Sequence, residues 1–145
     1  IQTRMELAKK LGADVVLGKD HDIVQTIMAH TNGQGVENSC EFSGSPNALS
    51  NTIHSTRMGG YVNVLSVYGN KMTEIPMNDI VFRYLHVKGI NGRKMWSTWD
   101  KMHELLSEEK IDIDTLVTHR VSFEDYPNGV ELAISGDCGK VVVDF

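Results

Sequence analysis

Cysteine is scarce in this sequence and long apolar runs are missing, and each absence excludes a class of protein. Cys40 and Cys138 lie far apart and follow no spacing pattern, which favours reduced thiols in a cytoplasmic protein over a disulfide framework. No stretch approaches the roughly 20 apolar residues that a membrane-spanning helix needs. The first ten residues mix charged and apolar side chains, unlike a secretory signal. We therefore expect a cytoplasmic protein without a membrane partner.

Clusters of basic residues are absent as well. The chain has 14 Lys and Arg against 19 Asp and Glu, a formal net charge of −5 at pH 7. Binding to nucleic acid depends on grouped cations that neutralise phosphates, so this charge pattern excludes nucleic acid as a partner. The composition, 41% hydrophobic and 23% charged, is that of a globular protein rather than a disordered one.

Familiar catalytic and metal-binding motifs are also missing. None of the six histidines belongs to a His-Glu-x-x-His string, and neither cysteine has a second cysteine two or four positions away. The Gly-Gln-Gly string at residues 33–35 lacks a third glycine and follows a predicted helix, so it is not a dinucleotide fingerprint. The pattern predicts no metal site and no catalytic residue. His119 and Cys40 are interpreted as structural, Cys40 as a small core residue.

Strand and helix patterns alternate at least four times, which is typical of a parallel sheet with helices on its faces. The predicted helices are residues 2–11, 23 to about 31, where TNGQG begins, 45–58, 78–84, 96–106 and 125–135. The predicted strands are ADVVLG at 13–18, VENSCEF at 36–42, YVNVLSV at 61–67, LHVKGI at 85–90, VTHRVSF at 117–123 and KVVVDF at 140–145. The expected fold is therefore α/β.

Several residues mark the expected ends and faces of the helices. Ser45 is a predicted N-cap with Pro46 in the first turn, where a missing N–H is harmless. Asn78 is the predicted cap of the helix at 78–84, and Gly59-Gly60 is expected to end the helix at 45–58. Trp96 and Trp99 share one helix face, which predicts that both indoles pack in the core. A binding surface is the second interpretation of this face.

Three predicted strands end in small residues or glycine-rich turns. These ends are residues 42–44, 65–67 and 89–93. Ligands of open parallel sheets lie beyond the carboxyl ends of the strands, so the three ends are expected to border one crevice. The third, GINGR, has two interpretations: its glycines simply make a turn, or backbone and Arg93 together hold an anion. The residues alone leave both open.

The string GINGRKMWSTW, with EFSGSP upstream and VTHRVSF and GKVVVDF downstream, resembles zinc-dependent medium-chain dehydrogenases, and among them those that oxidise L-threonine. The resemblance runs along all 145 residues but covers only the C-terminal part of such an enzyme. The most specific matches are Gly89, Ile90, Gly92, Arg93, Trp96, Thr98 and Trp99. The resemblance implies a Rossmann-type sheet, NAD as cofactor, and L-threonine as the small-molecule substrate of the parent.

The resemblance also assigns cofactor-binding roles. Arg4 matches an arginine beside the adenine ribose, and the backbone of Leu65 and Ser66 matches the pair that meets the nicotinamide carboxamide. Ile90, Asn91 and Arg93 match the segment that closes over the nicotinamide and pyrophosphate, where the guanidinium offers forked donors to phosphate. On resemblance, the GINGR loop therefore holds the cofactor.

Features of the family are missing, and they limit what is expected of the chain alone. The zinc ligands, the four-cysteine lobe and the glycine fingerprint belong to the family's N-terminal part, and the chain opens within a helical pattern. We therefore expect a truncated chain whose sheet lacks its first two strands and which is inactive alone. The expected division is a partial NAD-binding domain at 1–110 and a segment at 111–145 that returns to the catalytic domain.

Two rival interpretations stay open. One is a fragment of another zinc-type polyol or secondary-alcohol dehydrogenase. The other is a non-catalytic Rossmann-like assembly module, which the missing zinc ligands favour for the isolated chain. The resemblance also implies a homo-oligomer paired through residues 85–90, because related enzymes join their sheets at that edge.

Overall fold

A computed structural model describes residues 1–69 and 72–145, and it divides into two compact units. One unit is His21–Arg93, and the other combines Ile1–Asp20 with Lys94–Phe145. This division differs from the expected boundary at residue 110, which stays a prediction. Both units pair parallel strands with helices, which confirms the α/β class.

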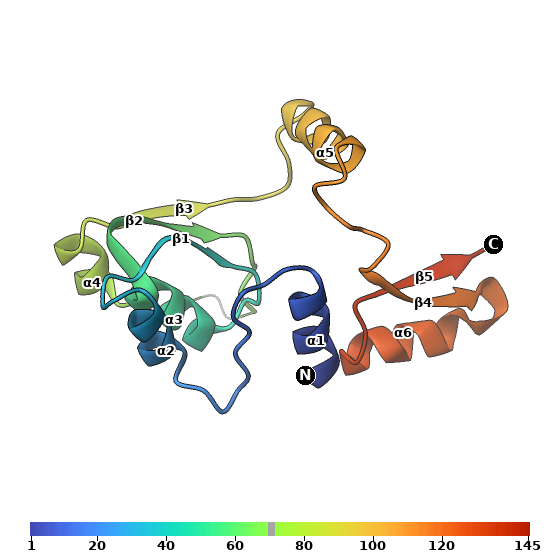
Figure 1. The fold of residues 1–145 in the computed structure, drawn as a ribbon, viewed down its shortest axis with the longest axis horizontal. Coiled ribbons are helices and arrows are strands. Elements are labelled where there is room, and N and C mark those ends of the chain that lie inside the picture. The colour runs from blue at the N-terminus through green and yellow to red at the C-terminus, as the bar shows by residue number, and fades with distance from the viewer. Residues whose placement is uncertain (70–71) are drawn as a thin grey trace. The chain divides into compact units, whose positions relative to one another are not determined.

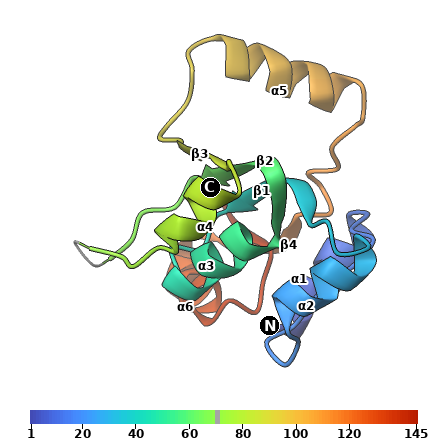
Figure 2. The same ribbon diagram turned by 90° about the vertical axis from the view of Figure 1, so that its left-hand side faces the viewer.

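The His21–Arg93 unit is a three-stranded parallel sheet in the order β1-β2-β3. The strands are β1 (Val36–Glu41), β2 (Thr56–Val64) and β3 (His86–Gly89). The helices are α2 (Ile23–His30), α3 (Pro46–Ser55) and α4 (Met77–Phe82). Helix α3 lies against one face of the sheet beside α2 (Figure 1), and Figure 2 shows α3 on the same face from a second direction.

The core of this unit lies between α3 and the sheet. Leu49 and Ile53 stand one helical turn apart on the buried face of α3, and they pack with Val62 of β2 and with Leu85. Val62 is fully buried and Ile53 is 1% exposed. Burial of such a side chain contributes about 1.5–3 kcal/mol, so this cluster holds the helix on the sheet.

Local sequence accounts for the start of α3. Ser45 occupies the N-cap position with extended backbone, and Pro46 begins the helix, as predicted. The Ser45 side chain makes no capping hydrogen bond. The neighbouring helix α2 does have one, because Asp22 Oδ1 accepts from the backbone N–H of Gln25 at 2.9 Å.

The other unit contains a parallel strand pair covered by a helix. Its elements are α1 (Gln2–Lys10), α5 (Ser97–Ser107), β4 (Val117–Ser122), the 3-10 turn η1 (Phe123–Asp125), α6 (Tyr126–Ser135) and β5 (Lys140–Asp144). Gly129 is buried inside α6, where an added Cβ would lie 2.9 Å from a Val121 methyl and 3.4 Å from Val141. The Asn-Gly pair in this helix therefore permits close packing on both strands.

One predicted strand is wrong. Residues 13–18 are irregular, and the Val15 side chain is 48% exposed. A strand is held by backbone hydrogen bonds to a neighbour, and within the described ranges 1–69 and 72–145 these residues pair with no strand. The apolar run therefore lacks the partner that would make it a strand.

Two predicted boundaries are also wrong. Gly59-Gly60 does not separate a helix from a strand, because β2 begins at Thr56 and runs through both glycines with an irregular register against β1. Helix α4 begins at Met77 with Pro76 in the cap position, so Asn78 lies inside the helix. In both cases the element starts earlier than the residue that favours its boundary.

Expectations of burial fail at two places. Trp96 and Trp99 were predicted to pack in a core, but they are 69% and 55% exposed. Cys40 was predicted to be a core residue, but its position in β1 is exposed, whereas Cys138 is buried. Periodicity identifies the helical face or strand but not what covers it.

In the part of the chain that the structure describes, no helix is both long and apolar enough to cross a bilayer.

Candidate functional site

The carboxyl ends of β1, β2 and β3 lie side by side, because the three strands are parallel neighbours. The backbone N–H of Leu65 donates to the Glu41 carbonyl oxygen at 3.0 Å, which continues the β1–β2 pairing past Val64. The Ile90 N–H donates to the Val64 carbonyl oxygen at 2.9 Å and ties in the end of β3. The strand ends therefore form one edge, the place where an open parallel sheet binds ligands.

The side chain of Glu41, the last residue of β1, is at the centre of this edge. It is 2% exposed. Its Oε1 accepts hydrogen bonds from the Ser43 backbone N–H at 2.6 Å, from the Ser43 hydroxyl at 2.5 Å and from the Gly44 N–H at 3.1 Å. One carboxylate oxygen thus holds the turn that follows β1.

The other carboxylate oxygen of Glu41 reaches the segment after β2. Oε2 accepts from the Ser66 hydroxyl and from the Tyr68 hydroxyl, the latter at 2.7 Å. Glu41, Ser43, Gly44, Ser66 and Tyr68 are called the Glu41 cluster below. Because its members follow two different strands, the cluster joins the ends of β1 and β2.

Gly44 brings the two segments into close approach. Its φ is +71°, and a Cβ at this position would lie 2.8 Å from the Val67 carbonyl oxygen. That distance is too short for any side chain, and the backbone conformation is one that glycine adopts at little cost. The turn after β1 can therefore pack on the backbone after β2 only with glycine here.

The surroundings of Glu41 stabilise its ionised form. Burial raises the pKa of the carboxyl, but hydrogen bonds from Ser43, Ser66 and Tyr68 outweigh it and lower the pKa to about 2. The pKa of Tyr68 is raised by burial and by the adjacent Glu41 carboxylate. At neutral pH the Glu41 cluster therefore contains one buried negative charge and neutral hydroxyl donors.

The structure brings together most of the cofactor-binding residues predicted by resemblance. Leu65, Ser66 and Ile90 stand at the neighbouring ends of β2 and β3, and the exposed Asn91 and Arg93 follow in the same loop. Gly92 in this loop has a φ of +65° and lies at a bend of the chain, which agrees with both interpretations of GINGR.

Arg4 has a different setting. It belongs to the unit that contains α1 and α6, where its Nε donates to the Cys138 carbonyl oxygen at 3.1 Å. An added Cβ on Gly136 would also lie 3.6 Å from the Arg4 guanidinium carbon. Arg4 therefore ties α1 to the loop before β5, and its proposed place at the adenine ribose stays a prediction.

Sequence reasoning missed Glu41 and Tyr68. The strand VENSCEF was predicted, but its acidic residue Glu41 was not connected to the Ser-Gly turn that follows. A carboxylate directly before a turn rich in N–H and hydroxyl donors was the available signal. Tyr68 had no local signal, because its hydroxyl meets Glu41 across 27 residues of sequence.

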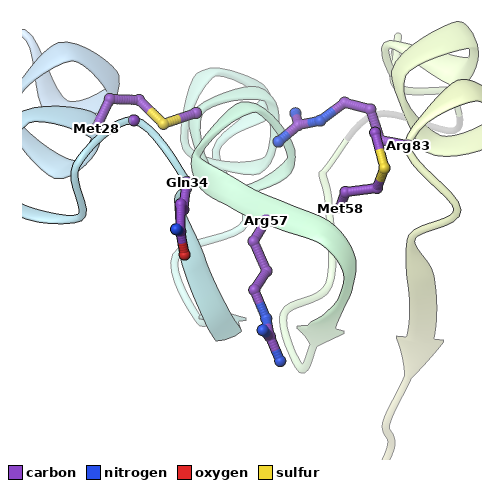
Figure 3. Close-up of a pocket in the computed structure, with 6 residues that line it drawn as sticks. Met28, Gln34, Arg57, Met58 and Arg83 are labelled. Atoms are coloured by element: carbon purple, nitrogen blue, oxygen red, sulfur yellow. The ribbon is translucent and has the colours of Figure 1, made fainter.

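A separate hollow of about 520 Å³ lies near the opposite ends of the strands. Figure 3 shows the side chains that line it, which are Met28, Gln34, Arg57, Met58 and Arg83. Both arginines are engaged by the chain itself. Arg57 pairs with Glu37 at 2.5 Å. Arg83 donates to three carbonyl oxygens at the end of α3, those of Ile53, His54 and Thr56. The hollow is thus distinct from the strand-end edge.

The strand ends carry hydrogen-bonding groups rather than a described cluster of metal ligands. Among residues 1–69 and 72–145, no group of three or more His, Cys, Asp or Glu side chains is arranged to hold a metal ion. The only carboxylate described in the Glu41 cluster is already satisfied by five donors. Backbone groups, the Asn91 amide and the Arg93 guanidinium fit a carboxamide and phosphates instead.

Comparison with known proteins identifies relatives along nearly the whole chain. The L-threonine 3-dehydrogenases of Bacillus licheniformis and Pyrococcus horikoshii are each 40% identical over 141 residues, 97% and 96% of this chain. The crystal structure of 2R,3R-butanediol dehydrogenase from Bacillus subtilis matches with a TM-score of 0.88 at 30% identity and covers 100% of this chain and 42% of that one. The chain spans about 41% of the length of the Bacillus licheniformis relative.

A model of one family matches residues 1–108, which include the three strand ends and the GINGR loop. Its description is zinc-binding dehydrogenase. This match covers most of the chain and agrees with the relatives and with the arrangement of β1, β2 and β3. The resemblance to medium-chain dehydrogenases is thereby confirmed, and the chain belongs to the zinc-binding dehydrogenase family.

Proposed function

We propose that this chain is the cofactor-binding portion of an NAD-dependent dehydrogenase that oxidises L-threonine to 2-amino-3-oxobutanoate. The observation that carries the proposal is the meeting of Leu65, Ser66 and Ile90 at neighbouring strand ends. The 40% identity to L-threonine 3-dehydrogenases supports the substrate. We also propose that residues 1–110 belong to the NAD-binding domain and residues 111–145 to the catalytic domain.

The proposed residues have separate tasks. The backbone of Leu65 and Ser66 orients the nicotinamide carboxamide, and Ile90 and Asn91 cover the ring. Arg93 offers its guanidinium to the pyrophosphate, and Arg4 lies by the adenine ribose. NAD, when bound, supplies the hydride acceptor. The described residues include no zinc-ligand group, so we expect no oxidation of threonine by this chain alone.

Binding of NAD to the chain itself is expected to be weak. A pyrophosphate is normally held by a glycine-rich turn at a helix N-terminus, and the sequence has no such fingerprint. We expect a dissociation constant above about 1 mM, a binding free energy weaker than roughly 4 kcal/mol. Titration calorimetry measures it. Micromolar binding would mean that these strand ends suffice without the fingerprint.

Arg93 is expected to act in a full-length protein that carries this segment. Arg93→Ala should weaken NAD binding by roughly 1–3 kcal/mol, the scale of a lost charge-assisted hydrogen bond. Zinc content should not change. The neighbouring Lys94→Ala is the matched control and should leave NAD affinity within about twofold. Equal effects of the two substitutions would make Arg93 a turn or packing residue.

A second substrate class has its own support. The butanediol dehydrogenase structure is similar over the whole chain, so a vicinal diol or another secondary alcohol is the alternative substrate. Initial rates of the full-length protein with L-threonine and with 2,3-butanediol decide between them. A higher kcat/KM for the diol would replace threonine in the proposal. Absence of NAD reduction with both would favour the non-catalytic assembly module.

Self-association through β3 is also proposed. β1 and β3 are the two edges of the three-stranded sheet, and Val87 on β3 is 45% exposed. Unpaired strand edges recruit other strands, so we expect a homodimer joined at residues 85–90. Light scattering at about 50 μM should show a dimer that Val87→Lys shifts toward monomer by at least tenfold in Kd, about 1.4 kcal/mol.

The control for this dimer is Asn38→Lys on the other edge strand. It places the same charge on β1 and should leave the dimer unchanged. A monomer in the unaltered chain would contradict self-association. Dissociation by Asn38→Lys and not by Val87→Lys would move the interface to β1.

A further inference from the structure

We propose that Glu41 is a positioning residue of the strand-end site: its carboxylate holds the segments after β1 and β2 so that the backbone at Leu65 and Ser66 keeps one conformation. The inference rests on the proposed function, because it concerns the backbone proposed to meet the nicotinamide. Glu41 itself is not placed in contact with the cofactor. It acts through the two segments it joins.

The division of hydrogen bonds between the two carboxylate oxygens carries this inference. Oε1 receives its donors from Ser43 and Gly44, and Oε2 receives its closest donors from Ser66 and Tyr68. The second, longer bond of the Gly44 N–H to Oε2 is 3.3 Å. A single rigid group therefore sets the distance between the turn after β1 and the segment after β2.

An ionised carboxylate only accepts hydrogen bonds, and this directs the hydroxyl groups around it. The hydroxyls of Ser43, Ser66 and Tyr68 must all point their protons at Glu41. The Ser66 hydroxyl is thus committed to Glu41. The hydrogen-bond donor that Ser66 can still present to a cofactor is therefore its backbone N–H, which agrees with the role proposed for it.

Glu41 is not a member of the core that holds α3 on the sheet, although Tyr68 of the Glu41 cluster packs against that core. Ile53 belongs to the core and sits on the last turn of α3, and it makes no hydrogen bond to Glu41 in the described contacts. Loss of Ile53 should therefore lower stability while every hydrogen-bond donor of Glu41 is kept. This separates a positioning role from a general contribution to stability.

The experiment compares the unaltered chain with Glu41→Ala, Glu41→Gln and the stability control Ile53→Ala by amide NMR. NAD is added to about 20 mM, so that a dissociation constant anywhere from about 1 to 20 mM leaves at least half of the chain bound. In the unaltered chain, NAD should shift the amide signals of Leu65, Ser66 and Ile90. Glu41→Ala should abolish these shifts and speed exchange of the Ser43 and Gly44 amides at least about tenfold.

The two other variants should keep the response to NAD. In Glu41→Gln the amide oxygen can accept from Ser43 and Gly44 while its NH₂ donates to the two hydroxyls, so the geometry is rescued. Ile53→Ala should lower the melting temperature as much as Glu41→Ala and still show the shifts. If Glu41→Ala fails to fold, Tyr68→Phe removes one donor alone and should reduce the Leu65 and Ser66 shifts.

Each outcome has a defined meaning. NAD shifts that persist in Glu41→Ala, or in Tyr68→Phe where that variant replaces it, would overturn the positioning role. Shifts lost equally in Ile53→Ala would overturn it too, because stability alone would then explain the loss. Absence of shifts in the unaltered chain would overturn the proposed function of these residues. In that case the exchange of Ser43 and Gly44 still decides whether Glu41 holds the turn.

Discussion

Lowering the pH from about 5 to about 2 is expected to remove about 3 kcal/mol from the free energy of unfolding through Glu41 alone. The carboxyl has a pKa of about 2 in the folded chain against an ordinary value of 4.5. A depressed pKa means that the folded state binds the proton less well than the unfolded state. The stabilisation is therefore complete above pH 4.5 and is lost as the pH falls through 2.

This loss of stability arises because the protonated carboxyl can no longer accept hydrogen bonds from all of its donors. The 2% exposed carboxylate accepts from Ser43, Gly44, Ser66 and Tyr68, and protonation replaces one acceptor site with a donor. Urea unfolding at a series of pH values measures the effect. Within this window, between the ordinary pKa and the lowered one, each fall of one pH unit reduces the free energy of unfolding by up to about 1.4 kcal/mol.

Glu41→Gln isolates this contribution, because it cannot titrate. The difference in unfolding free energy between the unaltered chain and Glu41→Gln should shrink by about 3 kcal/mol across the window. Glu37→Gln is the matched control on the same strand, since Glu37 is exposed and paired with Arg57 at the surface. A pH dependence that is the same with and without the Glu41 carboxylate would disprove its stabilising role.

Gly44→Ala is expected to destabilise the chain by about 2–5 kcal/mol. About 1–2 kcal/mol comes from forcing a side chain into the left-handed backbone region at a φ of +71°. A further 1–3 kcal/mol or so comes from the Cβ, which would lie 2.8 Å from the Val67 carbonyl oxygen and push the two segments apart. Urea unfolding at neutral pH provides the measurement.

Gly33→Ala is the control that separates these two costs. Gly33 has a φ of +78°, but nothing lies within 4 Å of its would-be Cβ. It should therefore show only the backbone cost, roughly 1–2 kcal/mol. Equal destabilisation by the two substitutions would show that the segment after β2 does not approach Gly44 closely in solution.

The elements that formed as predicted are those whose causes lie within a few residues. The Ser45-Pro46 pair begins α3, and the apolar residues one turn apart, Leu49 and Ile53, face the sheet. Capping, helical periodicity and strand alternation act over one or two turns of chain. Alternation of strands and helices then restricts the strands to a parallel arrangement, since parallel neighbours need a crossover between them.

The features that failed or were missed depend on partners far away in sequence. The run at 13–18 has strand character but no neighbour to pair with among the described strands. Trp99 sits on a helix face as its spacing indicates, yet that face is exposed. Amphipathic spacing states which side chains point the same way, and burial is decided by what lies opposite them.

The strand-end site combines both kinds of cause. Its residue types were visible locally, in the small and glycine-rich segments that follow each strand. The buried charge of Glu41 was not visible, because its donors Ser66 and Tyr68 are 25 and 27 residues away and meet it only when β1 and β2 pair in register. Hydrogen bonds and desolvation act over a few ångströms of space. The buried, ionised state of Glu41 therefore arises only when the fold has brought Ser66 and Tyr68 beside it.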